Sequence, residues 1–305
     1  MAHDSLKKRL AGVAFTTPTP FAGDTERVDH DALAENVSFL ADAGAEVIVP
    51  CGNTGEYYAL SHEERIAVVE THVEAAGDAT VVAGLAGSTK TALDLLSAYE
   101  AAGVDAVMAM HPDHTYIHER GLVEYYRRIA AATDLGVVLY KRGPEVTRRV
   151  LREVSAVGNV VAVKYAVNDV VDFSAAVAES DDVVFLDGSA ERLLPGYAVE
   201  GAQGFTTGIG NFAPEASLAL QDAIEDGDWE RARGIRELLR PLEDLRDAPG
   251  EDNTLGSANN VPVVKYGLEL AGLNGGPVRE PLVGLSPADR ERVEELYGRI
   301  EAADL

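Results

Sequence analysis

Eight short apolar runs alternate with amphipathic segments of helical period between residues 10 and 225. A short apolar run rich in β-branched residues predicts a strand buried on both faces, and the segments between the runs predict helices. Because strands that alternate with helices run parallel, the pattern predicts a parallel sheet with helices outside it. The predicted strands are 12–17, 46–51, 80–85, 106–110, 136–140, 160–164, 183–186 and 204–207, and the predicted helices are 29–43, 61–76, 89–102, 119–133, 147–157, 169–179, 191–199 and 213–225.

Eight strand–helix units of this size are typical of a closed (β/α)₈ barrel, or TIM barrel. The rival is an open doubly wound sheet, which is disfavoured because no Gly-x-Gly-x-x-Gly follows the first predicted strand. From residue 226 the pattern is helical only, at 228–246, 260–271 and 286–303, with a polar connecting loop at 246–260. We therefore expect an α/β chain with the barrel and its active site at 10–225 and a C-terminal helical extension at 226–305.

Cysteine usage and hydropathy narrow the class of protein. The single cysteine, Cys51, excludes an internal disulfide and a multi-cysteine metal site. No apolar run reaches the roughly 20 residues of a membrane-spanning helix, and the start of the chain lacks an apolar stretch of signal-peptide length. The sequence therefore predicts a cytoplasmic protein with no membrane partner.

The charge is strongly negative, with 51 acidic against 26 basic residues and a net charge of −25. Such a surface repels phosphates, so we expect no nucleic-acid partner. The carboxylates are spread along the chain in small groups and do not form a tail. A folded protein with this surface suits a high-salt cytoplasm, where screening removes the self-repulsion, and we therefore expect a halophilic protein.

Lys164 ends the apolar run at 160–164. Burying an ammonium group is costly, and desolvation lowers the pKa of such a lysine and turns the neutral amine into a nucleophile. The alternative is a structural lysine at a strand end, which extends to solvent or pairs with a carboxylate.

Other strand ends carry polar residues, and barrel enzymes place their sites at these ends. The turn at 51–56 offers exposed amides and the Thr54 hydroxyl for a carboxylate, or is an ordinary glycine turn. Tyr140 ends the fifth strand and is either a proton shuttle or a half-buried aromatic residue. The segment 204–211 is rich in glycine and threonine, which suits close approach to a ligand or a flexible turn.

Together these features resemble the dihydrodipicolinate synthase/N-acetylneuraminate lyase superfamily, which are class I Schiff-base lyases on a (β/α)₈ barrel. The resemblance covers nearly the whole chain. It rests on Gly52-x-Thr54-Gly55-Glu56, Tyr140, Lys164, Asn260-Val261-Pro262-Val263-Val264-Lys265 and Gly275-Gly276-Pro277-Val278-Arg279-x-Pro281.

The resemblance implies a Schiff base between Lys164 and the 2-keto group of a small-molecule keto acid. Tyr140 would move the proton, and Thr206 would face the Schiff base. The turn at Asn53, Thr54 and Gly55 would hold the substrate carboxylate. The iminium is the electron sink, so no metal or other cofactor is needed. His111 and His114 suggest a metal pair, but no third ligand accompanies them. The resemblance also implies a homo-oligomer, specifically a homotetramer.

Several positions depart from the lysine-biosynthesis enzyme of that superfamily. Asn53 replaces a threonine of the hydroxyl relay, and Glu145 replaces an arginine that binds the second substrate. His114 stands where the relay tyrosine is usual, either as an acid/base group or as a solvated loop histidine. Tyr140-x-Arg142 is similar to sugar-acid dehydratases such as 5-dehydro-4-deoxyglucarate dehydratase. Arg142, with its neighbour Lys141, would add positive charge for an anionic sugar acid at the barrel mouth.

We therefore expect a lyase that dehydrates a 2-keto-3-deoxy sugar acid. Retro-aldol cleavage of the same substrate class to pyruvate and an aldehyde is the close alternative, because both reactions use the same Schiff base. Dihydrodipicolinate synthase activity and phosphorylated substrates are less expected. A catalytically silent keto-acid sensor is the alternative from a different class, and the presence of both Tyr140 and Lys164 argues against it.

The charge predicts that molar KCl stabilises the fold. The midpoint of thermal unfolding should rise as KCl replaces low-salt buffer, because counterions screen the repulsion between surface carboxylates. Circular dichroism measures that midpoint. An unchanged or falling midpoint would contradict the high-salt interpretation.

Overall fold

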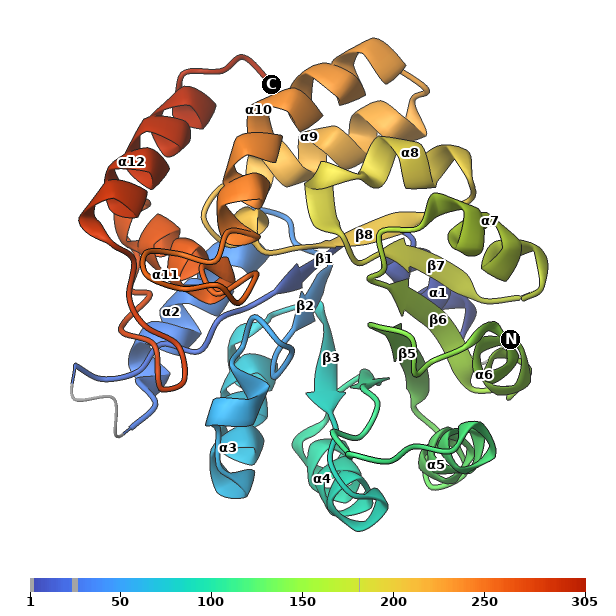
Figure 1. The fold of residues 1–305 in the computed structure, drawn as a ribbon. Helices are drawn as coiled ribbons and strands as arrows, with labels where there is room; N and C mark the ends of the chain where they lie inside the picture. Colours follow the sequence, from blue (N-terminus) through green and yellow to red (C-terminus); the bar gives the residue numbers. More distant parts are fainter. Residues whose placement is uncertain (1–2, 24–26, 181) are drawn as a thin grey trace.

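A computed structural model describes residues 3–23, 27–180 and 182–305, so the first two residues of the N-terminal segment lie outside the described part. Eight parallel strands close into a barrel in sequence order, which confirms the predicted fold class (Figure 1). The strands are β1 (Val13–Thr16), β2 (Val47–Val49), β3 (Thr80–Leu85), β4 (Ala106–Ala109), β5 (Gly136–Lys141), β6 (Val160–Tyr165), β7 (Val184–Asp187) and β8 (Gly204–Thr207).

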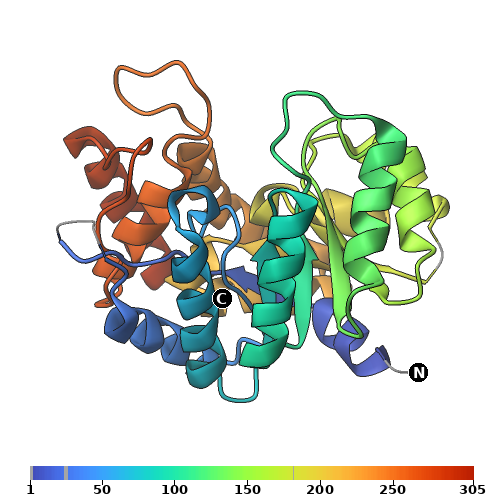
Figure 2. The ribbon, with the colours of Figure 1, turned by 90° about the horizontal axis from the view of Figure 1, so that it is seen from below.

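Helices surround the barrel, and the last three gather on one side of it (Figures 1 and 2). The α-helices are α1 (Asp4–Leu10), α2 (His30–Asp42), α3 (His62–Ala75), α4 (Thr89–Ala102), α5 (Glu119–Ala130), α6 (Arg148–Ser155), α7 (Val170–Ala178), α8 (Leu194–Val199), α9 (Pro214–Glu225), α10 (Trp229–Arg246), α11 (Asn260–Leu270) and α12 (Pro287–Glu301). Short 3₁₀ helices lie at η1 (Tyr57–Ala59), η2 (Ala190–Arg192) and η3 (Ile209–Asn211). In the part of the chain described, none of these helices is long and apolar enough to cross a membrane.

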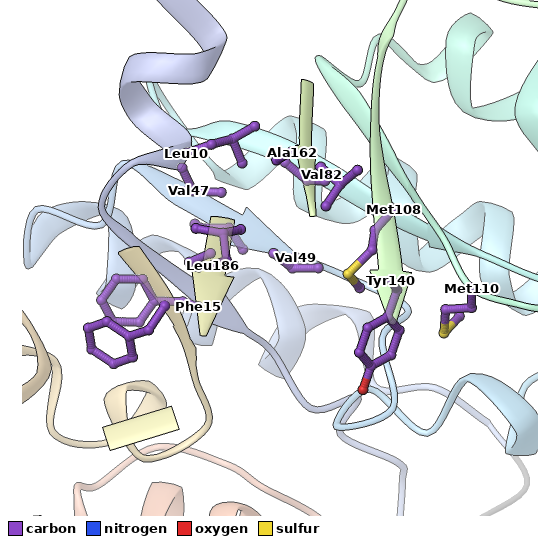
Figure 3. Packing of buried hydrophobic residues seen from close by; sticks show 14 of the residues in the cluster. Leu10, Phe15, Val47, Val49, Val82, Met108, Met110, Tyr140, Ala162 and Leu186 are labelled. Carbon is purple, nitrogen blue, oxygen red and sulfur yellow. The ribbon is translucent and has the colours of Figure 1, made fainter. Parts of the chain in front are cut away.

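The barrel interior is a packed core. Alternate side chains along each strand point to the same face, so Val47 and Val49 of β2 both point inward, together with Met108 and Leu186 from other strands (Figure 3). In this view Leu10 lies at one end of the cluster and the Tyr140 hydroxyl at the other. The amino end is therefore closed by apolar side chains, and polar groups begin at the carboxyl ends of the strands.

The N-terminal helix α1 is not among the predicted helices. It contacts β6 and β7, and Leu10 at its end is buried. Gly136 makes room for it, because a Cβ there would lie 2.3 Å from Cδ2 of Leu6. A helix of 7 residues with three basic side chains in its last turn has too little apolar pattern to be recognised in the sequence.

The predicted helix at 191–199 is wrong as a single element. The chain forms η2 and then begins again as α8, with Pro195 in the first turn of α8. Proline has no N–H to donate to Glu191 and its ring collides with that carbonyl, so one continuous helix is excluded. The break turns the buried Glu191 side chain towards β8 and α9, where it accepts hydrogen bonds from Thr207 and Ser217 at 2.5 and 2.6 Å.

A buried histidine joins α3 to the end of β1. The His72 Nδ1 lies 2.7 Å from the Val68 carbonyl oxygen, and its Nε2 lies 2.8 Å from the Thr17 hydroxyl. A carbonyl only accepts, so Nδ1 carries the proton and Nε2 accepts from the hydroxyl, which describes a neutral ring. Burial lowers the pKa of His72 to about 4, against the opposing bond to Val68.

This histidine predicts loss of stability in mild acid. The folded-state pKa lies below the unfolded value near 6.5, so the stabilisation is present above pH 6.5 and is lost as pH falls towards 4. Relative to His72→Gln, the wild-type free energy of unfolding should fall by roughly 2 kcal/mol between pH 7 and pH 5. Denaturant titrations measure this, with the exposed His114→Gln as control. Parallel pH curves for wild type and His72→Gln would contradict it.

Candidate active site

A cavity of about 440 Å³ opens at the carboxyl ends of the strands. Its walls come from the ends of the strands, the turn after β2, the α10–α11 segment and the segment that follows α11. The polar residues that line it include Thr16, Asn53, Thr54, Glu56, Tyr140, Arg142, Lys164, Arg192, Thr206, Gly208, Glu243, Arg246, Asp247, Asn260 and Arg279.

Lys164 lies deep in this cavity. It is 7% exposed, and its Cα pairs with that of Tyr140 across β5 and β6. The Nζ stands 4.6 Å from the centre of the Tyr140 ring. Within the described part of the chain no carboxylate lies within ion-pair distance of it, so the ion-paired alternative is not found.

Burial is the main cause that lowers the pKa of Lys164, to about 7. The charges of Arg246 and Arg142 lower it further, and the carboxyl group of Asp187 opposes them. A substantial fraction of the amine is therefore neutral near neutral pH, which is the form that attacks a carbonyl carbon.

Tyr140 presents a protonated hydroxyl to the same space. Burial raises its pKa, and this outweighs the nearby Arg142 charge and the hydrogen bond from Asn53. The Asn53 Nδ2 donates to the Tyr140 Oη at 3.2 Å. An amide N–H can stabilise a phenolate but cannot pass a proton along as a hydroxyl does, so Asn53 does not connect the Tyr140 phenol to a further proton donor.

The threonine hydroxyls form a separate chain. Thr16 Oγ1 donates to the Thr207 carbonyl at 2.7 Å, and it lies 3.2 Å from the Thr54 Oγ1. Because the Thr16 proton is committed to the carbonyl, Thr54 is the donor of the second bond. Among the described residues neither of these hydroxyls is hydrogen-bonded to Tyr140, whose partner is Asn53.

Gly55 shapes the turn and does not line the cavity. A Cβ at this position would lie 3.0 Å from the Thr17 carbonyl oxygen and 3.2 Å from the Cys51 nitrogen. The expected contact between Gly55 and substrate is therefore replaced by a packing role, because the residue faces β1 and the start of its own turn.

The turn is fixed from behind by a buried ion pair. Glu56, in the left-handed conformation at φ 54°, lies 2.6 Å from the Nζ of Lys265 on α11. Its other oxygen accepts from the Arg279 backbone N–H at 3.1 Å. Lys265 also donates to the Pro277 carbonyl at 2.6 Å. The C-terminal extension therefore holds the turn that carries Thr54.

Two residues expected near the mouth of the cavity do not line it in this chain. His114 is exposed, does not line the cavity, and accepts the Tyr116 N–H at 3.0 Å within its own loop. Lys141 adds no charge there, because it is buried and donates to the Val146 carbonyl at 2.8 Å. Glu145 also lies outside the cavity lining, whereas Arg142 and Thr206 line it as expected.

The α10–α11 segment supplies residues that were not predicted from the sequence. Arg246 is buried and contacts Glu243 at 2.5 Å and the Asn260 Oδ1 at 3.0 Å. Its guanidinium lies against Gly208, where a Cβ would come within 2.3 Å of Nη2. Several arginines and acidic residues occur along α10, so the helix sequence alone does not distinguish Arg246 as buried.

The described residues contain no group of three or more His, Cys, Asp or Glu side chains placed to hold a metal ion. The polar groups that the cavity offers to a substrate are the Lys164 amine, the Tyr140 phenol, hydroxyl and amide groups, and charged side chains.

Comparison with known proteins agrees with this geometry. Residues 9–300 match the dihydrodipicolinate synthetase family. A 4-hydroxy-tetrahydrodipicolinate synthase of Methanothrix thermoacetophila is 33% identical over 92% of this chain and 94% of its own. The dihydrodipicolinate synthase structure from Oceanobacillus iheyensis has a TM-score of 0.92 and 37% identity, covering 98% of this chain and 99% of that one. A catalytic lysine mutant of the Ruminococcus gnavus sialic acid aldolase has a TM-score of 0.87 and 25% identity, covering 97% of each chain.

The neutral fraction of Lys164 predicts how adduct formation depends on pH. Deprotonation supplies the nucleophile, so the initial rate of borohydride-trapped adduct formation with pyruvate should rise roughly tenfold from pH 6 to pH 8 and then level off. Mass spectrometry of the intact protein measures the rate. Lys164→Ala should form no adduct, and the exposed Lys90→Ala should match wild type. A rate that climbs steadily towards pH 10 would show an ordinary lysine pKa.

Proposed function

The chain belongs to the dihydrodipicolinate synthetase family and is a Schiff-base-forming lyase, and we propose that it removes water from a 2-keto-3-deoxy sugar acid. One observation carries the proposal. The buried amine of Lys164 lies beside a phenol, Tyr140, whose hydroxyl is hydrogen-bonded in the described chain to the Asn53 amide alone. This pair can move one proton between positions on a single bound molecule.

The proposed sequence begins when the Lys164 amine attacks the C2 carbonyl. Tyr140 protonates the carbinolamine hydroxyl, which leaves as water and gives the iminium and a phenolate. The Asn53 N–H and the Arg142 charge stabilise that phenolate. The positive iminium acidifies C3, so the phenolate removes a C3 proton and leaves a neutral enamine.

Elimination follows from the enamine. Its electron pair forms the C3–C4 double bond and expels the 4-hydroxyl, which departs as water with the proton returned by Tyr140. Hydrolysis of the resulting iminium frees the product and restores the amine and the phenol. The raised pKa of Tyr140 keeps the phenol protonated before substrate binds and makes its phenolate a strong base, so the same group can take the C3 proton and return it to the departing hydroxyl.

The substrate carboxylate would lie at the turn that carries Thr54. Glu56 fixes the turn through Lys265, and Arg142 supplies a positive charge near Tyr140. Arg142 also has no hydrogen bond or ion pair to the described residues, so its guanidinium is available to an anion.

Two alternatives keep specific support. Aldol cleavage to pyruvate uses the same Schiff base, and a sialic acid aldolase shares the fold over nearly all of the chain. The name 4-hydroxy-tetrahydrodipicolinate synthase belongs to the relative from Methanothrix. Two residues argue against the same synthase activity in this chain. Asn53 interrupts the hydroxyl chain at Tyr140, and Glu145 replaces the arginine expected for a second substrate. A homotetrameric state, a cytoplasmic location and a high-salt habitat stay predictions of the sequence.

Borohydride trapping in molar KCl tests the reaction type. With a 2-keto-3-deoxypentonate or 2-keto-3-deoxyhexonate, the Lys164 adduct should be lighter than the substrate adduct by one water. A pyruvate-sized adduct would instead establish aldol cleavage. Absence of any adduct with these acids and with pyruvate would overturn the proposed function and favour a keto-acid sensor.

Tyr140→Phe tests the proton shuttle. Loss of the hydroxyl should lower kcat by roughly 10²–10⁴-fold with little change in substrate binding, because general acid–base catalysis supplies about that factor. Steady-state kinetics in molar KCl measure it, with the exposed Tyr116→Phe as control. A change below about threefold would remove Tyr140 from the mechanism.

A further inference from the structure

The cavity has two walls of different electrostatic character. On the wall near Tyr140, Arg142 is available to an anion. The opposite wall, which we call the α10–α11 wall, consists of Arg192, Glu243, Arg246, Asp247 and Asn260, and all five residues line the cavity. Arg192 belongs to η2, and it joins this wall through its ion pairs to α10.

Every arginine of the α10–α11 wall is already neutralised. Arg246 pairs with Glu243 at 2.5 Å, and both side chains are buried. Arg192 lies 3.0 Å from Asp244 and 2.9 Å from Asp247. These five described residues carry two guanidinium groups and two carboxylates that pair with each other or with Asp244, which leaves no surplus positive charge for a second anionic group.

The same wall is suited to neutral hydroxyl groups. A guanidinium has five N–H donors, and Arg246 directs three hydrogen bonds to protein, to Glu243 and to the side chain and carbonyl of Asn260. The remaining N–H groups of Arg246 can donate to a hydroxyl oxygen, and the carboxylate oxygens of Glu243 and Asp247 can accept the hydroxyl proton. The contact between Arg246 and Gly208 places this wall directly beside the end of β8, next to Thr206.

We propose that the α10–α11 wall is the subsite for the substrate tail and that it selects an uncharged, hydroxylated tail. The substrates are then 2-keto-3-deoxyaldonates, with one carboxylate, and the corresponding aldarates, with a carboxylate at each end, are rejected. This inference rests on the proposed function. A second carboxylate at this wall would lie beside Glu243 and Asp247, and burying such a charge without a cation is costly.

The first test compares two substrates of equal length. In molar KCl, kcat/KM for a 2-keto-3-deoxyhexonate should exceed that for the 2-keto-3-deoxyhexarate of matching configuration by about 10²-fold or more, because a buried unpaired charge is penalised strongly. Equal values for the two acids, or a preference for the hexarate, would overturn the inference.

The second test removes one negative charge from the wall. Glu243→Gln leaves the Arg246 charge without its carboxylate, so the hexonate-to-hexarate ratio should fall by about tenfold or more. Glu230→Gln, at the exposed start of the same helix, makes the same charge change away from the cavity and should keep the wild-type ratio. An unchanged ratio in a folded Glu243→Gln protein would contradict the inference.

Two further measurements distinguish a failure of the proposed Schiff-base function from a failure of the inference about the α10–α11 wall. Pyruvate has no tail, so its trapping on Lys164 tests the Schiff-base function alone; trapping with an unselective ratio refutes only the α10–α11 wall. If Glu243→Gln does not show a cooperative thermal transition, Asp247→Asn replaces it. The Asp247 side chain is 52% exposed, and its substitution should lower the ratio by about threefold or more, whereas an unchanged ratio would overturn the inference.

Discussion

The exclusion of water from the Lys164 amine is the condition on which the chemistry of this protein depends. The closed barrel provides it, because the parallel pairing of β5 and β6 sets Lys164 and Tyr140 side by side above an apolar interior. An ammonium in that position loses hydration without a carboxylate to replace it, so the free amine is favoured. The barrel core desolvates the lysine, and this desolvation favours the neutral, nucleophilic form of the amine.

The polar side chains around the Lys164 amine form two separate hydrogen-bonded groups. Tyr140 and Asn53 are hydrogen-bonded to each other at the cavity, whereas Thr54 and Thr16 form a hydroxyl chain that ends at a backbone carbonyl. Because an asparagine stands where a hydroxyl would connect the two, protons do not pass between them. In the proposed mechanism, the turn would bind a carboxylate without drawing on the proton that Tyr140 moves.

The sequence predicted the parts of the site that follow from strand position and failed where side-chain direction decides. Lys164, Tyr140 and Thr206 come together because the carboxyl ends of parallel strands meet at one face. His114 sits in a loop whose direction no periodicity fixes. Arg246 could not be singled out, because its burial depends on Gly208 from a distant segment. Pro195, in contrast, is visible in the sequence, and the prediction of one helix across it overlooked that an interior proline interrupts a helix.

The buried pair of Glu56 and Lys265 bears on how such a chain can evolve. One residue belongs to the second loop of the barrel and the other to a helix more than two hundred positions away, and each neutralises the other. Substituting either alone strands a charge in the interior, so the two positions are constrained to change together. The helical extension is thus not a detachable module. Recombination between related genes would keep this buried charge balanced only when the two joined segments carry a matching pair at these positions.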